Sequence, residues 1–119
     1  MAYTTTAEVR KLHRLFTVTN IPDESVEAFI ADAELEINDV LGLATSLTGT
    51  EITQSGVSAA AKYYCAMACC RYDSQIFDST EEQKSQINYF VGAYKYALSR
   101  LTVKRGRGLE PSFKITSNS

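Results

Sequence analysis

The stretch that decides the fold runs from Pro22 to Gly42 and reads PDESVEAFIADAELEINDVLG. Its proline and aspartate are typical of a helix start, and its glycine is typical of the position just past a helix end. Between them, apolar residues recur every three or four positions, which predicts a helix over residues 23–41 with a buried stripe. Replacing Phe29 or Ile37 with alanine should then cost on the order of 2–5 kcal/mol. The stripe consists of Val26, Phe29, Ile30, Ala33, Ile37, Val40 and Leu41.

The other face of this helix is acidic. It carries seven carboxylates, and no lysine or arginine occurs between Asp23 and Asp39. The early acids complement the positive N-terminal end of the helix, but the later ones lie too far along the chain to do so. We interpret the later acids either as a solvated face or as a surface for a basic partner. The seven are Asp23, Glu24, Glu27, Asp32, Glu34, Glu36 and Asp39.

Two capping boxes mark the starts of a short first helix and a long last helix. Thr5 and Ser79 each precede a glutamate by three residues, a spacing in which the two residues satisfy each other's free backbone N–H groups. We predict the first helix over residues 6–16 and the last over residues 80–101. Gly92 lies inside the last helix, where glycine costs about 1 kcal/mol relative to alanine. We therefore expect Gly92 to mark a close packing contact, and the alternative is a tolerated glycine on the helix surface.

A helix of small side chains is predicted between them, over about residues 54–73. It is rich in alanine, carries three cysteines and is nearly apolar all round, which is typical of a central helix buried on several sides. We expect it to be the most buried element. The sequence thus predicts an all-α fold: a small four-helix bundle over residues 1–101, followed by an extended C-terminal arm over residues 102–119.

The composition is that of a globular domain. The chain has 119 residues, 45% of them hydrophobic and 22% charged, so it can form one core without metal or disulfides. A formal net charge of −2 excludes a protein that coats nucleic acid through bulk charge alone. No apolar run approaches the ~18 residues of a membrane span, and the first residues do not read as a secretory signal. We expect no membrane association.

The cysteines and the single histidine do not suggest a reactive site. Cys65, Cys69 and Cys70 cluster in one alanine-rich run, and we interpret them as buried thiols that pack as small hydrophobes in a reducing compartment. A metal or nucleophile site would need further partners, and the only histidine, His13, is far away in sequence. We expect His13 on a solvated surface. Its basic neighbours are Arg10, Lys11 and Arg14.

The sequence contains no pattern typical of catalysis. It has no glycine-rich phosphate loop, dinucleotide fingerprint, His-x-x-x-His pair or Cys-x-x-Cys pair. Its carboxylates follow one helix face instead of forming an isolated pair in an apolar cleft. We therefore expect a protein that is not an enzyme and that uses no cofactor and no metal.

The predicted arm is basic and carries a short strand pattern. Phe113 and Ile115 alternate with polar residues, so they would lie on one side of an extended segment that is too short to form a sheet alone. The basic residues would contact either nucleic-acid phosphates or the acidic helix of a neighbouring copy. The third interpretation is a disordered C-terminus without a binding role. These basic residues are Lys104, Arg105, Arg107 and Lys114.

The order of these features resembles the head–tail connector, or adaptor, proteins of tailed bacteriophages. The resemblance covers about residues 4–101, and most of it is carried by the proline break Ile21–Asp23 and the helix from Val26 to Leu41. A short capped helix precedes these features, and an alanine-rich helix with Tyr63–Tyr64, a further helix and an extended tail follow them.

The resemblance implies a structural protein of the virion neck, assembled in the host cytoplasm. Such adaptors form a homo-oligomeric ring, commonly a dodecamer, beneath the portal protein of the DNA-filled head. They join it to the tail or to a head-completion (stopper) protein, and genomic DNA passes through the lumen. On this reading the portal-binding arm residues are Lys104, Arg105, Arg107, Phe113, Lys114 and Ile115. The inter-subunit candidates are Glu27, Glu34, Asp39 and Arg100.

An alternative from another class is a small helical DNA-binding protein of phage packaging or regulation. It would use the basic first helix, with Arg10, Lys11 and Arg14, or the basic arm. The negative net charge and the lack of a basic stripe along a long helix weigh against this alternative.

Overall fold

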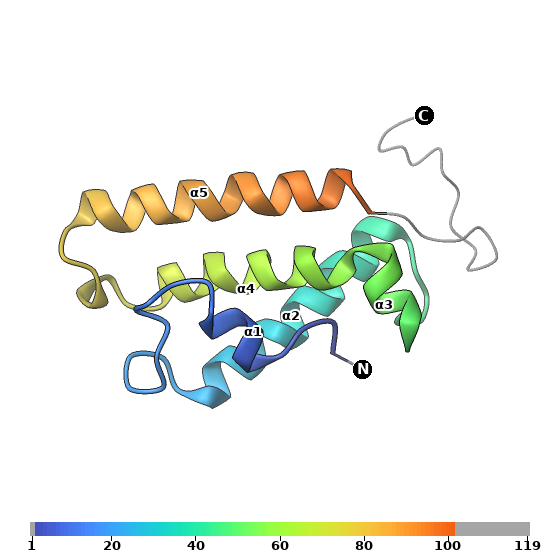
Figure 1. Ribbon diagram of the computed structural model, residues 1–119, viewed down its shortest axis with the longest axis horizontal. Coiled ribbons are helices and arrows are strands. Elements are labelled where there is room, and N and C mark those ends of the chain that lie inside the picture. The colour runs from blue at the N-terminus through green and yellow to red at the C-terminus, as the bar shows by residue number, and fades with distance from the viewer. Residues whose placement is uncertain (1, 102–119) are drawn as a thin grey trace.

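The computed structural model describes residues 2–101, and every described element is helical (Figure 1). The long helices α2, α4 and α5 form the bundle, so the predicted all-α fold is confirmed. The α-helices are α1 (Thr6–Arg10), α2 (Asp23–Leu41), α3 (Thr50–Ser55), α4 (Val57–Tyr72) and α5 (Thr80–Ser99), and a 3-10 turn spans Ser74–Ile76.

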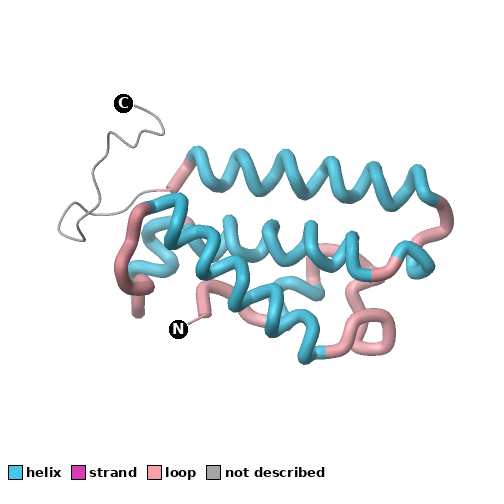
Figure 2. The backbone as a smooth tube through the Cα atoms, turned by 180° about the vertical axis from the view of Figure 1, so that it is seen from behind, coloured by secondary structure: helices cyan, strands magenta, loops and turns pink. Residues whose placement is uncertain are grey.

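Helix α4 is the centre of the bundle. Figure 1 shows α5 running along one side of α4 while α2 crosses α4 on another side, and Figure 2 shows the same order from behind. Eight residues of α4 are buried, more than on any other described helix, as predicted from its apolar composition. Ala60, Ala61 and Ala66 are fully buried, and their small side chains let α2 and α5 approach the α4 backbone.

The third helix, predicted over about residues 54–73, corresponds to α4, and a separate short helix, α3, precedes it over Thr50–Ser55. Gly56 has φ of 90°, a left-handed conformation that ends α3 and begins α4. Glycine is favoured here because side-chain-bearing residues rarely adopt this φ, whereas a Cβ would make only an ordinary contact with Leu101 Cδ2 at 3.6 Å. Because α3 was not predicted, the described bundle has five α-helices where four were expected.

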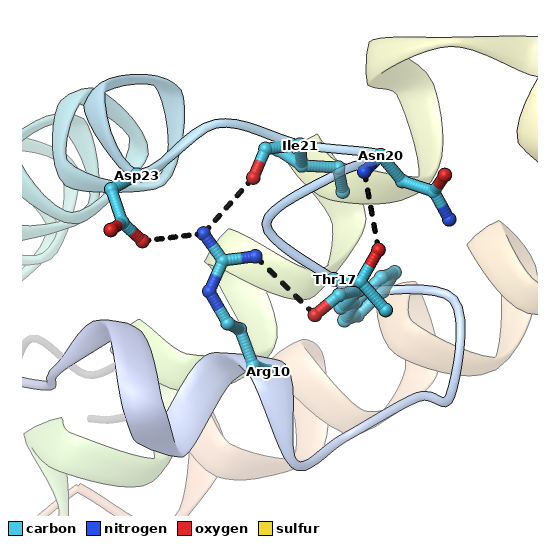
Figure 3. Close-up of polar contacts among 6 residues, drawn as sticks. Arg10, Thr17, Asn20, Ile21 and Asp23 are labelled. Atoms are coloured by element: carbon cyan, nitrogen blue, oxygen red, sulfur yellow. Dashed lines mark hydrogen bonds and ion pairs between the residues drawn. The ribbon is translucent and has the colours of Figure 1, made fainter.

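The first helix is shorter than predicted, ending at Arg10 instead of residue 16. The Arg10 guanidinium donates hydrogen bonds to the carbonyl oxygens of Phe16 (3.3 Å) and Ile21 (3.0 Å) and to Asp23 Oδ1 (2.7 Å) (Figure 3). The backbone N–H of Asn20 donates to Thr17 Oγ1 at 3.1 Å. Side-chain bonds thus hold residues 11–22 as turns, and they replace the expected helical hydrogen bonds.

The buried stripe of α2 is narrower than predicted. Five of its seven members are buried, but Phe29 is half-buried and Val40 is exposed. Phe29 lies at the edge of the core, with its ring edge-on to Tyr72 at 6.4 Å between centroids. Val40 lies in the last turn of α2, just before the chain turns away at Gly42 with φ of 70°. Phe29→Ala should therefore cost less than the same truncation at Ile37, which is fully buried.

Gly92 does not mark a close contact within the subunit. A Cβ built on Gly92 would meet no heavy atom within 4 Å, and the residue is exposed on the outside of α5. Among residues 2–101, Gly92 is therefore a surface glycine, which was the alternative interpretation.

The three cysteines are buried thiols, as predicted. All three side chains have zero exposure, and burial raises the pKa of the Cys65 and Cys69 thiols to about 12. Residues 2–101 contain no group of three side chains suited to hold a metal ion.

His13 is half-buried, where a solvated position was expected. Its Nδ1 accepts a hydrogen bond from the Leu15 N–H at 3.1 Å, and its ring lies 5.3 Å from Phe16 and 6.0 Å from Phe77 between centroids. Burial and, to a lesser degree, the charge of Arg14 lower its pKa below the ordinary 6.5, while Glu82 opposes the shift.

This lowered pKa predicts a pH-dependent stability. Between the folded pKa and 6.5 the unfolded chain binds more protons, so the contribution of His13 is complete above pH 6.5 and is lost as pH falls through this window. We expect the free energy of unfolding to decline there, and His13→Asn, which keeps an acceptor for the Leu15 N–H, to flatten the decline. Urea unfolding of both chains across this window checks the prediction, and parallel pH profiles would contradict it.

Candidate assembly surfaces

The outward side of α2 is an acidic face around one exposed leucine, and we call it the α2 outer face. Leu35 is 68% exposed at its centre. Asp32 and Asp39 lie within about one helical turn of Leu35, and no salt bridge joins either to a cation among residues 2–101. The face consists of Glu24, Ala28, Ala31, Asp32, Leu35 and Asp39, all exposed.

The negative field of α2 also reaches α4. Burial raises the pKa of the Tyr64 hydroxyl, and the charges of Asp32 and Glu36 add to this shift. Two carboxylates of α2 thus influence a hydroxyl on α4, while the charge of Arg71 opposes the shift.

Two of the predicted inter-subunit acids lie away from this face. Glu27 and Glu34 line a cavity of about 460 Å³ between α2 and the N-terminal residues 2–6, and Glu34 also accepts a hydrogen bond from the Ser46 hydroxyl. Asp23 is paired with Arg10. The structure thus brings Glu27 and Glu34 together but separates them from Asp39, because they lie toward the N-terminal segment.

The outward side of α5 is aromatic and basic, and we call it the α5 outer face. Tyr89 and Tyr96 are 64% and 65% exposed, with Gly92 between them. The Arg100 guanidinium lies over the Tyr96 ring at 5.6 Å from its centroid, and no described acid forms a salt bridge with Arg100. The face consists of Lys84, Tyr89, Gly92, Lys95, Tyr96 and Arg100, all exposed.

Sequence reasoning singled out Arg100 and Gly92 but missed the two exposed tyrosines of this face. The signal was present, because two tyrosines seven residues apart lie on the same side of a helix with Gly92 between them. The pattern was obscured by the stronger stripe of Phe90, Tyr94 and Ala97, which is buried against α4.

The basic residues of the first turns are engaged within the molecule. Arg10 pairs with Asp23 at 2.7 Å, Lys11 with Glu8 at 3.3 Å, and Arg14 approaches Glu82 at 3.9 Å. The Arg10 side chain is only 16% exposed. This arrangement gives little support to a DNA-binding role for the first helix.

The predicted arm residues lie outside the described residues: Lys104, Arg105, Arg107, Phe113, Lys114 and Ile115. Within residues 2–101, none of the helices combines the length and the apolar character required to cross a membrane. Comparison of the chain with protein-family models, with curated proteins and with solved structures gave no match. The connector family is therefore a resemblance carried by the pattern of helices.

Proposed function

We propose that this chain is a structural adaptor of a tailed-phage virion, which forms a ring between the portal and the tail or the next connector protein. The observation that supports it best is the pair of outer faces on α2 and α5. One face is acidic and the other is basic, and they lie on different sides of α4. Contacts between unlike patches of identical subunits generate rings when the rotation closes.

In this role the bundle forms the ring body, and the C-terminal arm docks on the portal. An extended arm that adds a strand to a partner's sheet edge gains main-chain hydrogen bonds, and Phe113 and Ile115 would fill pockets there. Lys104, Arg105 and Arg107 would contact acidic portal groups or DNA phosphate. The ring lumen continues the DNA channel, and the protein performs no catalysis.

The proposal is tested by measuring the mass of the full chain in solution, alone and with the portal protein of the same phage. We expect a portal complex that carries several copies of this chain. Parallel titration with duplex DNA distinguishes the alternative class, because a DNA-binding module gives an affinity that falls steeply with salt. Salt-sensitive DNA binding without portal binding would contradict the adaptor role.

A further inference from the structure

We propose that the α2 outer face of one copy binds the α5 outer face of the next, with Leu35 inserted beside Gly92 between Tyr89 and Tyr96. This inference deepens the proposed adaptor function, on which it rests, by naming the subunit interface. Its occupant is a second copy of this chain.

A glycine at the centre of the α5 outer face leaves the helix backbone accessible to a partner. Gly92 has open space around it within the subunit, although glycine inside a helix costs about 1 kcal/mol relative to alanine. No neighbour among residues 2–101 requires this residue to lack a side chain. A partner that approaches the α5 backbone at this point does require it.

The shapes of the two faces are complementary. On α5, Tyr89 lies three residues before Gly92 and Tyr96 lies four residues after it, so two rings flank a notch one helical turn away on each side. On α2, Leu35 projects beside the small side chains of Ala28 and Ala31. A single large side chain among small ones fits a notch between two large ones, as in the packing of helix ridges into grooves.

The charges of the two faces are complementary as well. Lys84, Lys95 and Arg100 are exposed on α5, and no described salt bridge involves them. The α2 outer face offers Glu24, Asp32 and Asp39, with no cation among its members. Docking would surround the apolar contact with pairs of opposite charge, which favours this orientation and disfavours others.

The same charges argue against pairing of like faces. If two α5 helices crossed antiparallel at Gly92, Lys84 of one copy, eight residues before the crossing, would lie beside Arg100 of the other, eight residues after it. Two α2 outer faces would place acids against acids. Like charges at close range are repulsive, so the contact is between unlike faces and leaves each copy with one free face of each kind.

Two single substitutions separate the faces. Leu35→Gln removes the projecting side chain, and Gly92→Gln fills the notch; both positions are exposed, and a Cβ at position 92 has open space. We expect each variant alone to self-associate at least about tenfold more weakly than the natural chain, by sedimentation or light scattering. Val18→Gln, at a position that is 59% exposed in the segment before α2, is the matched control and should associate normally.

Mixing the two variants gives the decisive result. The Leu35→Gln copy retains an intact α5 outer face and the Gly92→Gln copy an intact α2 outer face, so an equimolar mixture should form a two-copy particle that grows no further. Monomers in the mixture would overturn the proposal, as would a natural chain that stays monomeric at every concentration, or single variants that assemble like it.

Cross-linking provides a second measurement that tolerates imperfect folding of either glutamine variant. The native thiols are buried, so a short bismaleimide should react at cysteines introduced by Ala31→Cys and Lys95→Cys. Both positions are exposed at the edges of the two faces, and these substitutions keep Leu35, Gly92 and both tyrosines in place. A chain with both substitutions should give a ladder of oligomers, whereas a ladder absent from the double variant would overturn the interface. Assembly through these faces without portal binding would leave the interface standing and defeat only the adaptor role. If the Leu35→Gln and Gly92→Gln variants still formed rings on the portal, the adaptor role would stand and the proposed interface would be overturned.

Discussion

Deleting residues 102–119 is expected to abolish binding to the portal while the helical bundle remains folded. The described core lies within residues 2–101, and Leu101 packs against it, so a chain that ends at Leu101 retains these contacts. The deletion removes the basic residues and the strand pattern that the adaptor model assigns to docking. Portal affinity should fall by roughly a hundredfold or more, because strand addition and its pockets supply most of such an interface.

A shorter truncation is the control that distinguishes loss of the arm from loss of the last few residues. Removing only residues 117–119 deletes three polar residues but keeps Phe113 and Ile115, and this chain should bind the portal like the full one. Pull-down with portal protein and thermal unfolding of both truncations check the prediction. Full binding by the chain that ends at Leu101 would assign docking to the bundle instead.

Ile37→Ala is expected to lower the free energy of unfolding by about 2–5 kcal/mol. Ile37 is fully buried in the stripe of α2 that faces the core, and truncation removes apolar contacts and leaves a cavity beside the slim helix α4. A loss of this size is a large fraction of the stability of a small domain. Urea denaturation of both proteins measures this loss. We expect a lower midpoint and an unchanged dependence of the unfolding free energy on urea concentration.

Val40→Ala is the control on the same helix. Valine at this position is also β-branched and aliphatic, but it is 39% exposed in the last turn of α2. Its truncation should change the free energy of unfolding by less than about 0.5 kcal/mol. Equal losses at the two positions would show that α2 packs over a wider stripe than the structure describes.

Long periodic segments were predictable, and the reason lies in side-chain periodicity. The bounds of α2 follow from Pro22, the apolar spacing and Gly42, and the start of α5 follows from the capping box at Ser79. The burial of α4 follows from its lack of a polar face. These features depend on residues close to one another in sequence.

The departures from prediction depend on features that side-chain periodicity does not encode. The first helix ends early because Arg10 bonds to the carbonyl oxygens of Phe16 and Ile21, which periodicity does not encode. The left-handed conformation of Gly56, with φ of 90°, separates α3 from α4 and is a backbone feature that apolar spacing does not encode. The α5 outer face is recognisable only once the buried stripe of α5 has been assigned to α4.

For the proposed adaptor role, the most direct test is the mass of the complex between the full chain and the portal protein that the proposal assigns to it. Native mass spectrometry or electron microscopy of the purified complex should show a closed ring of copies seated on the portal, with a continuous central channel. The Gly92→Gln variant should fail to complete this ring. If the purified portal carried no copies of this chain, at concentrations where the full-length protein is folded, the adaptor role would be contradicted.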